Sequence, residues 1–210
     1  MIRYVGVNPQ TGDAEWLDAN GNITLNPSTN DRVVVGSPLP DFSGGITNNF
    51  KYKDFDLSVL MNYSYGNEIV LDGLRFADGN DAIGGIVNIR TQNLNFWRQP
   101  GDNAFLPSPT SVTFNRFNQR SSLQMLDGSY LRLKNITLGY NVPKKALDKL
   151  GFISGLRFYA TATNLFTIKG NELDGIDPEV TDDVDPLFQG ETFFTAPQSK
   201  SYLFGARLTF

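Results

Sequence analysis

The chain has 210 residues, of which 40% are hydrophobic, and its formal net charge of −4 argues against a large nucleic-acid-binding surface. The absence of Cys excludes disulfides and zinc thiolates, and the absence of His removes the commonest general base and any Ser-His-Asp triad. No run approaches the roughly 18 consecutive apolar residues of a membrane-spanning helix. No signal peptide follows Met1, so either the protein stays in the cytoplasm or its signal lies upstream.

Alternating apolar and polar residues predict five β-strands of about eleven residues each. The strands are expected near residues 42–52, 55–65, 130–142, 156–166 and 200–210. The first two form a hairpin, because only Lys53 and Asp54 separate them. In the third strand Leu131 and Leu133 disturb the alternation, which indicates a β-bulge or a barrel rim.

The connection between the third and fourth strands starts with Pro143 and ends with Gly151, which predicts one or two helical turns. Its Lys144, Lys145 and Lys149 form a small basic cluster, and a solvated helical face is the simplest interpretation.

Strand length, aromatic placement and loop length all favour a membrane β-barrel. Eleven residues tilted by about 40° cover roughly 28 Å, close to the ~25 Å apolar band of such a barrel. Aromatic residues lie near the strand ends, where interfacial girdles belong. Long connections (1–41, 66–129, 167–199) alternate with short ones (53–54, 143–155), as external loops and periplasmic turns do. Residues 1–41 are therefore expected as an external loop, residues 42–210 as a C-terminal barrel segment, and Phe210 in the periplasm.

Five strands cannot close a barrel, so the fold class predicted is all-β, the last five strands of a larger antiparallel up-and-down transmembrane β-barrel. An open sheet in lipid would leave edge groups unpaired at several kcal/mol each. The missing strands are expected N-terminal to this chain. A soluble antiparallel sandwich also alternates apolar and polar residues, and it stays open as the alternative. Its loops would be unusually long.

Several short sequences stand out in order along the chain. They are GSPLPDFSGG (36–45), YKDFDLS (52–58), FWRQPGD (96–102), DGSYLRLKNITLGY (127–140), ATNLFT (162–167), PQSKSY (197–202) and GARLTF (205–210). Together they resemble the C-terminal part of the SusC/RagA-type TonB-dependent transporters.

The resemblance implies a barrel of about 22 strands in the outer membrane, with an N-terminal plug, driven by the TonB complex. It also implies a SusD-like surface lipoprotein partner and uptake of glycans or peptides, with no enzymatic activity and no cofactor. Plug, TonB-contact segment and signal peptide would all lie upstream. Two alternatives remain, a soluble β-rich carbohydrate-binding or interaction module and a simple porin.

The family's first loop often carries an acidic, calcium-hand-like sequence. Here Asp18, Asn20 and Asn22 occupy the corresponding stretch, and Asn replaces acids at two of the ligand positions. Because hard cations prefer several charged oxygen ligands, a plain Asn/Gly turn is favoured over a calcium site.

Three further sets of residues are candidates for function. Trp97, Arg98 and Asp102 in the second long loop could contact a sugar or an anion, although a loop anchor needs no ligand. The acidic run at residues 174–186 is interpreted as a solvated loop, and its Asp182–Asp183 pair alone does not indicate glycoside hydrolysis. Asp56, Asn62, Arg157 and Arg207 are predicted to face the barrel lumen and pair with the plug.

The last strand carries a possible assembly signal. Tyr202, Phe204, Leu208 and the terminal Phe210 alternate with other residues in a pattern that resembles the signal read by the barrel-assembly machinery. The same alternation also serves contact with outer-membrane lipid, so both roles are expected of these residues.

Overall fold

The computed structural model describes residues 1–78, 90–148, 151–179 and 189–210, and the chain divides into two compact units. The first, here called the loop unit, comprises Met1–Pro38, Glu68–Asp127 and Val180–Thr195. The second, here called the sheet unit, comprises Leu39–Asn67, Gly128–Glu179 and Ala196–Phe210. Each unit is described by itself.

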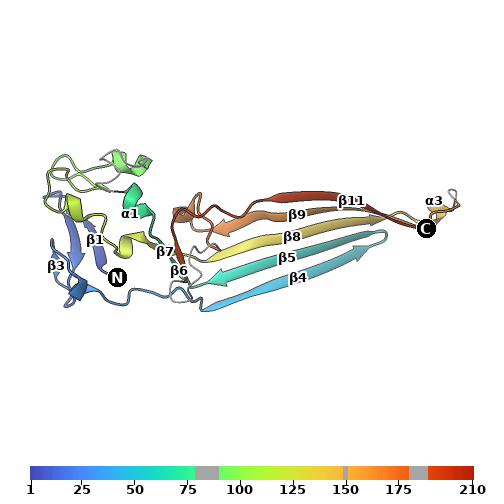
Figure 1. Ribbon diagram of the computed structural model, residues 1–210, viewed down its shortest axis with the longest axis horizontal. Coiled ribbons are helices and arrows are strands. Elements are labelled where there is room, and N and C mark those ends of the chain that lie inside the picture. The colour runs from blue at the N-terminus through green and yellow to red at the C-terminus, as the bar shows by residue number, and fades with distance from the viewer. Residues whose placement is uncertain (79–89, 149–150, 180–188) are drawn as a thin grey trace. The chain divides into compact units, whose positions relative to one another are not determined.

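The sheet unit is built on five long antiparallel strands that lie side by side (Figure 1). They are β4 (Phe42–Tyr52), β5 (Phe55–Tyr65), β8 (Tyr130–Asn141), β9 (Gly155–Lys169) and β11 (Ser201–Thr209). Their spatial order, β4-β5-β8-β9-β11, follows their order in the chain, which is an up-and-down meander. The predicted all-β antiparallel fold is confirmed. Among the described residues, β4 and β11 each pair with a single strand.

The strand register sorts the side chains of the sheet onto two faces. One row pairs Leu57 with Leu138, Leu138 with Ala160, and Ala160 with Phe204. The neighbouring row on this face is likewise apolar, and it runs through Val59, Ile136, Ala162 and Tyr202. We call this side the apolar face. The alternate residues, such as Ser58, Thr137 and Thr161, form the polar face.

Both short connections of the sheet lie at one end of it, together with the C-terminus (Figure 1). Lys53 makes the β4–β5 turn with a left-handed backbone (φ 52°). The β8–β9 connection contains the short helix α3 (Lys144–Leu147), which buries Leu147 and leaves Lys144 and Lys145 exposed. Lys149 lies outside the described residues.

The loop unit contains two small three-stranded sheets. One has the order β1-β2-β3, formed by Arg3–Val7, Ala14–Leu17 and Ile23–Thr24. The other has the order β10-β6-β7, formed by Glu191–Thr192, Glu68–Leu71 and Met125–Asp127. Helix α1 is Leu74–Ala77, and 3₁₀ turns lie at Thr29–Asp31, Thr91–Leu94, Phe114–Arg116 and Ser122–Gln124; a further 3₁₀ turn, Asn171–Leu173, belongs to the sheet unit.

An aromatic core holds the loop unit together. Trp16, Leu106 and Phe117 are almost fully buried, and Tyr4 packs edge-on against both Trp16 and Phe117 at ring-centroid distances of 5.9 and 5.8 Å. Burial raises the pKa of the Tyr4 hydroxyl. The structure thus places a packed sheet within residues 1–41, where the sequence predicts only a loop.

Candidate functional site

The best-formed polar cluster in the sheet unit begins at a β-bulge. Leu60 pairs with Asn135, but the next residue of β5, Met61, pairs with Leu133, so Lys134 is an extra residue in β8. The register between β8 and β9 shifts at the same place, where Asn164 of β9 has a left-handed backbone (φ 52°). The bulge predicted from the disturbed alternation of Leu131 and Leu133 is therefore present.

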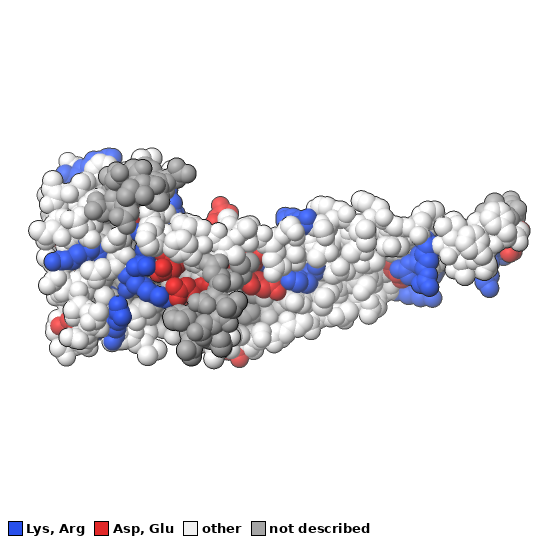
Figure 2. All heavy atoms as spheres, in the orientation of Figure 1, with Lys and Arg blue, Asp and Glu red and all other residues white. Residues whose placement is uncertain are grey.

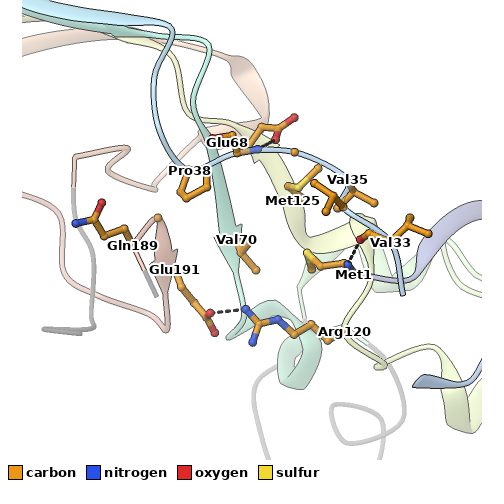
Figure 3. A pocket seen from close by; sticks show the side chains of 14 residues that line it. Met1, Val33, Val35, Pro38, Glu68, Val70, Arg120, Met125, Gln189 and Glu191 are labelled. Atoms are coloured by element: carbon orange, nitrogen blue, oxygen red, sulfur yellow. Dashed lines mark hydrogen bonds and ion pairs between the residues drawn. The ribbon is translucent and has the colours of Figure 1, made fainter. Parts of the chain in front are cut away.

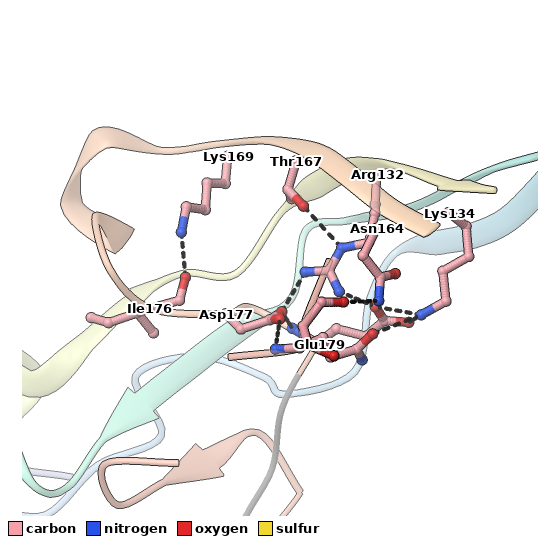
Figure 4. Close-up of polar contacts among 10 residues, drawn as sticks. Arg132, Lys134, Asn164, Thr167, Lys169, Ile176, Asp177 and Glu179 are labelled. Carbon is pink, nitrogen blue, oxygen red and sulfur yellow. Dashed lines mark hydrogen bonds and ion pairs between the residues drawn. The ribbon is translucent and has the colours of Figure 1, made fainter. Parts of the chain in front are cut away.

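The Arg132 guanidinium lies at the centre of this cluster, with 3% of its side chain exposed (Figure 4). Its Nε donates to the Thr167 hydroxyl at 2.9 Å, and Nη1 donates to the Glu179 carboxylate at 2.7 Å. Nη2 forms an ion pair with Asp177, whose side chain is 5% exposed. Charge-assisted contacts of this kind are the stronger hydrogen bonds of proteins.

Asp177 connects the strand to two loop segments. One carboxylate oxygen accepts from the Glu179 amide at 3.0 Å, and the other accepts from the Gln198 amide at 2.9 Å. Burial alone would raise the pKa of Asp177, but the hydrogen bonds from Arg132 and from the two amides outweigh it and lower the pKa below the ordinary Asp value. Asp177 therefore stays ionised.

Lys134 completes the cluster. Its ammonium group lies 3.1 Å from both Glu179 oxygens and 3.0 Å from the Gln198 side-chain oxygen. The two cations, Arg132 and Lys134, are thus balanced by Asp177 and Glu179. The sequence interpretation of residues 174–186 as a solvated loop is wrong for Asp177 and Glu179, because both pair with strand cations; Asp182 and Asp183 lie outside the described residues.

The residues predicted to face a lumen share the polar face of the sheet. Asn62 pairs in register with Arg132, and Arg157 pairs with Arg207. Arg157 also reaches across β8 to Asp56, at 2.6 Å. A Cβ at Gly139, between them, would lie 2.3 Å from the Arg157 guanidinium and 2.7 Å from Asp56, so only glycine leaves room for this pair as it stands.

Trp97, Arg98 and Asp102 lie in the loop unit and contact their own chain. The Trp97 indole donates to the Pro9 carbonyl at 2.8 Å, and its ring lies where a Cβ on Gly12 would be. Asp102 accepts from the Arg98 amide at 2.9 Å, while the Arg98 guanidinium lies 4.5 Å from the centre of the Phe96 ring. These contacts fit a loop anchor and require no ligand.

Asp18, Asn20 and Asn22 form a hydrogen-bonded turn. The Asp18 carboxylate accepts from the amides of Asn20 and Asn22, each at 2.8 Å, and these bonds, those from Asn22 foremost, lower its pKa. Within residues 1–78, 90–148, 151–179 and 189–210, no three acidic side chains are grouped so as to hold a metal ion. The Asp18 oxygens are used by the turn itself.

The four residues of the possible assembly signal project from β11 and the C-terminus. Tyr202, Phe204, Leu208 and Phe210 are all exposed, and the first three belong to the apolar face. Other residues of that face, such as Phe50 and Leu138, are exposed as well.

A pocket of about 320 Å³ lies in the loop unit (Figure 3). Its wall includes the apolar side chains Val35, Val70 and Met125, and an ion pair between Arg120 and Glu191 lies at its side. The carboxylate of Glu68, also in the wall, accepts from the Ser37 amide at 2.7 Å. The wall of the pocket thus combines apolar side chains with charged ones.

No helix in the described parts of the chain is long and apolar enough to cross a membrane.

Known proteins give the context for these features. The chain is 36% identical over 163 residues to TonB-dependent receptor P3 of Formosa agariphila, which covers 78% of this chain and 15% of the receptor. It is 28% identical over 195 residues to the TonB-dependent receptor SusC of Bacteroides thetaiotaomicron, covering 93% of this chain and 17% of SusC. The chain is homologous to a segment of the SusC-type TonB-dependent receptors.

Comparison with solved structures agrees with this. The whole chain matches 22% of a chain of the RagAB peptide importer in its closed-closed state, with a TM-score of 0.80 and 26% identity. No family model matches the chain. The chain spans less than a fifth of the length of each of the two receptors. The resemblance to SusC/RagA-type transporters expected from the sequence is confirmed.

The Arg132 cluster was missed by sequence reasoning. The anionic partners of Arg132, Asp177 and Glu179, lie 45 and 47 residues further along the chain, and spacing does not reveal such contacts. The sequence held one indication of the cluster. Arg132 and Lys134 alternate with Leu131 and Leu133 in a predicted strand, and cations that are buried in such a strand require anionic partners.

Proposed function

We propose that this chain is the C-terminal barrel segment of an outer-membrane transporter that takes up glycans or peptides with energy from the TonB complex. The observation that carries the proposal is the apolar face, where Phe50, Tyr202 and Phe204 are each more than half exposed. Such a surface is an aggregation hazard in water and the normal exterior of a barrel in lipid. The names of the relatives, receptors and an importer, support transport as opposed to enzymatic activity.

The topology we propose has residues 1–41, 66–129 and 167–199 outside the cell and the two short turns in the periplasm. In this arrangement Phe210 is periplasmic, since the C-terminus lies at the same end of the sheet as both turns. Bacterial barrels have short periplasmic and long external connections, which supports this orientation.

The partners we propose follow from the same assignment. The polar face, with Asp56, Asn62, Arg157 and Arg207, lines the lumen and faces the plug, and the apolar face contacts outer-membrane lipid. Tyr202, Phe204, Leu208 and Phe210 present the last strand to the barrel-assembly machinery. A SusD-like lipoprotein covers the external mouth; the RagAB match, a peptide importer, supports both the partner and a peptide among the possible substrates.

Cysteine labelling of intact cells tests the topology, because this segment has no native Cys. Val34, which is 94% exposed, is changed to Cys in one variant of the full-length receptor, and Lys53 in another. A membrane-impermeant maleimide should label Val34→Cys in intact cells but Lys53→Cys only after the outer membrane is opened. The parent receptor shows the background. Equal labelling of both sites in intact cells would contradict the proposed topology.

Uptake assays separate the transporter from a porin. Cells that depend on the receptor for growth on one glycan or one peptide mixture should stop growing on it when TonB is deleted. Growth that survives TonB deletion but not receptor deletion would indicate a simple porin. A monodisperse, cooperatively melting chain expressed without detergent would instead indicate a soluble module.

A further inference from the structure

The Arg132–Asp177 pair differs from the ion pair that Arg157 and Asp56 form elsewhere on the polar face. Arg132 and Asp177 have 3% and 5% of their side chains exposed, whereas Arg157 and Asp56 have 35% and 29%. Arg157 and Asp56 both belong to strands that the sheet already holds in register. Asp177 belongs to no strand, so its place depends on the contacts of its own side chain and its neighbours.

Asp177 joins two segments that are distant in sequence. Through its two oxygens it binds the amides of Glu179 and Gln198, so the segment leaving β9 and the segment leading to β11 meet at one carboxylate. We call residues 171–179 the outgoing limb and residues 196–200 the returning limb.

Each limb also has its own contacts with the sheet. Lys169 donates to the Ile176 carbonyl in the outgoing limb, and Asn164 donates to the Ser199 carbonyl in the returning limb at 3.1 Å (Figure 4). Lys134 touches both limbs, through Glu179 and Gln198. Both limbs are therefore hydrogen-bonded to side chains of β8 and of β9.

The limbs lie at the points where the chain leaves the sheet unit and returns to it. The sheet unit ends at Glu179 and resumes at Ala196, and the sixteen residues Val180–Thr195 between them belong to the loop unit. Both ends of that stretch are thus within three residues of an amide bound to Asp177. Removing this carboxylate would remove one contact from each limb at once.

We propose that Arg132 and Asp177 form a latch that holds the outgoing and returning limbs together, while the sheet itself holds together without it. With the latch closed, the two limbs are fixed side by side on the polar face. With the latch open, the two limbs separate, yet β8, β9 and β11 keep their backbone pairing. This inference goes beyond the proposed function, since it holds for whichever substrate the receptor takes.

Hydrogen–deuterium exchange on the full-length receptor in detergent tests the latch. In Asp177→Ala and in Arg132→Met, backbone amides of both limbs should exchange at least about tenfold faster than in the parent, because local opening sets their exchange. Amides of β8, β9 and β11 should exchange at unchanged rates.

The matched control is Arg157→Met, which removes the Arg157–Asp56 ion pair of the same face and should leave the limbs protected. If limb exchange is unchanged in both latch variants, or if the strands are loosened as much as the limbs, the latch is disproved. If neither latch variant folds, Glu179→Gln decides the question. It removes a partly exposed partner and should accelerate exchange in the limbs alone by a few-fold, and no acceleration there would overturn the proposal.

Discussion

Large aromatic side chains have opposite environments in the two units. In the loop unit Trp16 and Phe117 are almost fully buried, with Tyr4 packed against both. In the sheet unit Phe50, Phe204 and Phe210 leave well over half of their surface exposed, while the most enclosed polar group on the other face is a charged one, Arg132. One unit follows the rule for water-soluble domains and the other reverses it.

The difference is the one expected if the two units meet different solvents. The loop unit gains stability by taking apolar surface out of water, at about 25 cal/mol per Å². The sheet unit does so to a smaller extent, because large side chains of its apolar face such as Phe50, Leu138 and Phe204 remain exposed. Under the proposed function, lipid covers these side chains.

The largest expected effect is in the core of the loop unit. Trp16→Ala should lower the free energy of opening of β1–β3 by about 3–5 kcal/mol, since it removes a fully buried ring and leaves a cavity. Exchange rates of the β2 amides in the receptor report this free energy. Phe204→Ala, an exposed ring of similar size, is the control and should change strand exchange little. If the two changes accelerate amide exchange equally, aromatic side chains do not differ in their contribution to stability between the two units.

The second-largest expected effect is that of placing a charge on the apolar face. Ile136→Arg should destabilise the receptor in lipid by about 2–4 kcal/mol, because it places a charge without a partner at the middle of the strand, on the proposed barrel exterior. Thr137→Arg puts the same charge on the polar face and should cost much less. Urea unfolding of the two variants in lipid vesicles measures the difference. A larger loss for Thr137→Arg would mean that the faces are assigned the wrong way round.

Two glycines sharpen the comparison at a smaller scale. Gly12 has φ +76° and lies under the Trp97 ring, so Gly12→Ala should cost about 1–3 kcal/mol through backbone strain and a displaced ring. Gly139→Ala displaces only the flexible ends of Arg157 and Asp56, a partly exposed pair worth about 0–1 kcal/mol. Denaturation of the two variants should rank them in this order, and the reverse order would show that the ion pair matters more than its exposure suggests.

Acid should open the outgoing and returning limbs only at low pH. The folded pKa of Asp177 is lowered, so its contribution is complete above the ordinary Asp pKa of about 3.9 and is lost as pH falls through the folded value. Limb amides, with exchange rates corrected for the intrinsic effect of pH, should therefore stay protected at pH 5 and lose protection below about pH 4. In Asp177→Ala, the limb amides should already be unprotected at pH 5. Loss of protection in the parent at pH 5 would contradict the direction of the shift.

The smallest expected effect is that of calcium on the loop unit. Because the Asp18 oxygens already accept hydrogen bonds from their own turn, millimolar Ca²⁺ or its removal with EDTA should leave β1–β3 exchange unchanged. A calcium-dependent slowing that disappears in Asp18→Ala would show that the turn binds the ion.

Where a regular pattern runs for about eleven residues, the sequence predicted the structure closely. Strands β4 and β5 begin and end at the predicted residues, and β8 ends one residue early, at Asn141. Strand β9 continues three residues past the predicted 166, because the irregularity at Asn164 interrupts the alternation without ending the strand. Period two is a strong signal in a sheet whose two faces meet different environments.

The loop unit could not be predicted in the same way. Strands β1 to β3 have two to five residues, too few for alternation to be recognised, and their core contacts come from far along the chain. The Thr113 hydroxyl, for example, accepts from the Ala14 amide across 99 residues. The Arg132–Asp177 pair joins residues 45 apart for the same reason. Such contacts depend on the folded path of the chain, which composition and spacing do not encode.

The extra residue at the β8 bulge has a consequence for reading relatives of this protein. Counting two by two from Ile136 towards the start of the strand would assign Arg132 to the apolar side, yet the register pairs Arg132 with the polar Asn62. A relative with a single-residue gap opposite Lys134 would keep the β5 partners of Tyr130 to Leu133, because the register already passes over that position. In an alignment, such a gap marks the loss of the bulge and of one cation, while the side chains on either side of it stay on their faces.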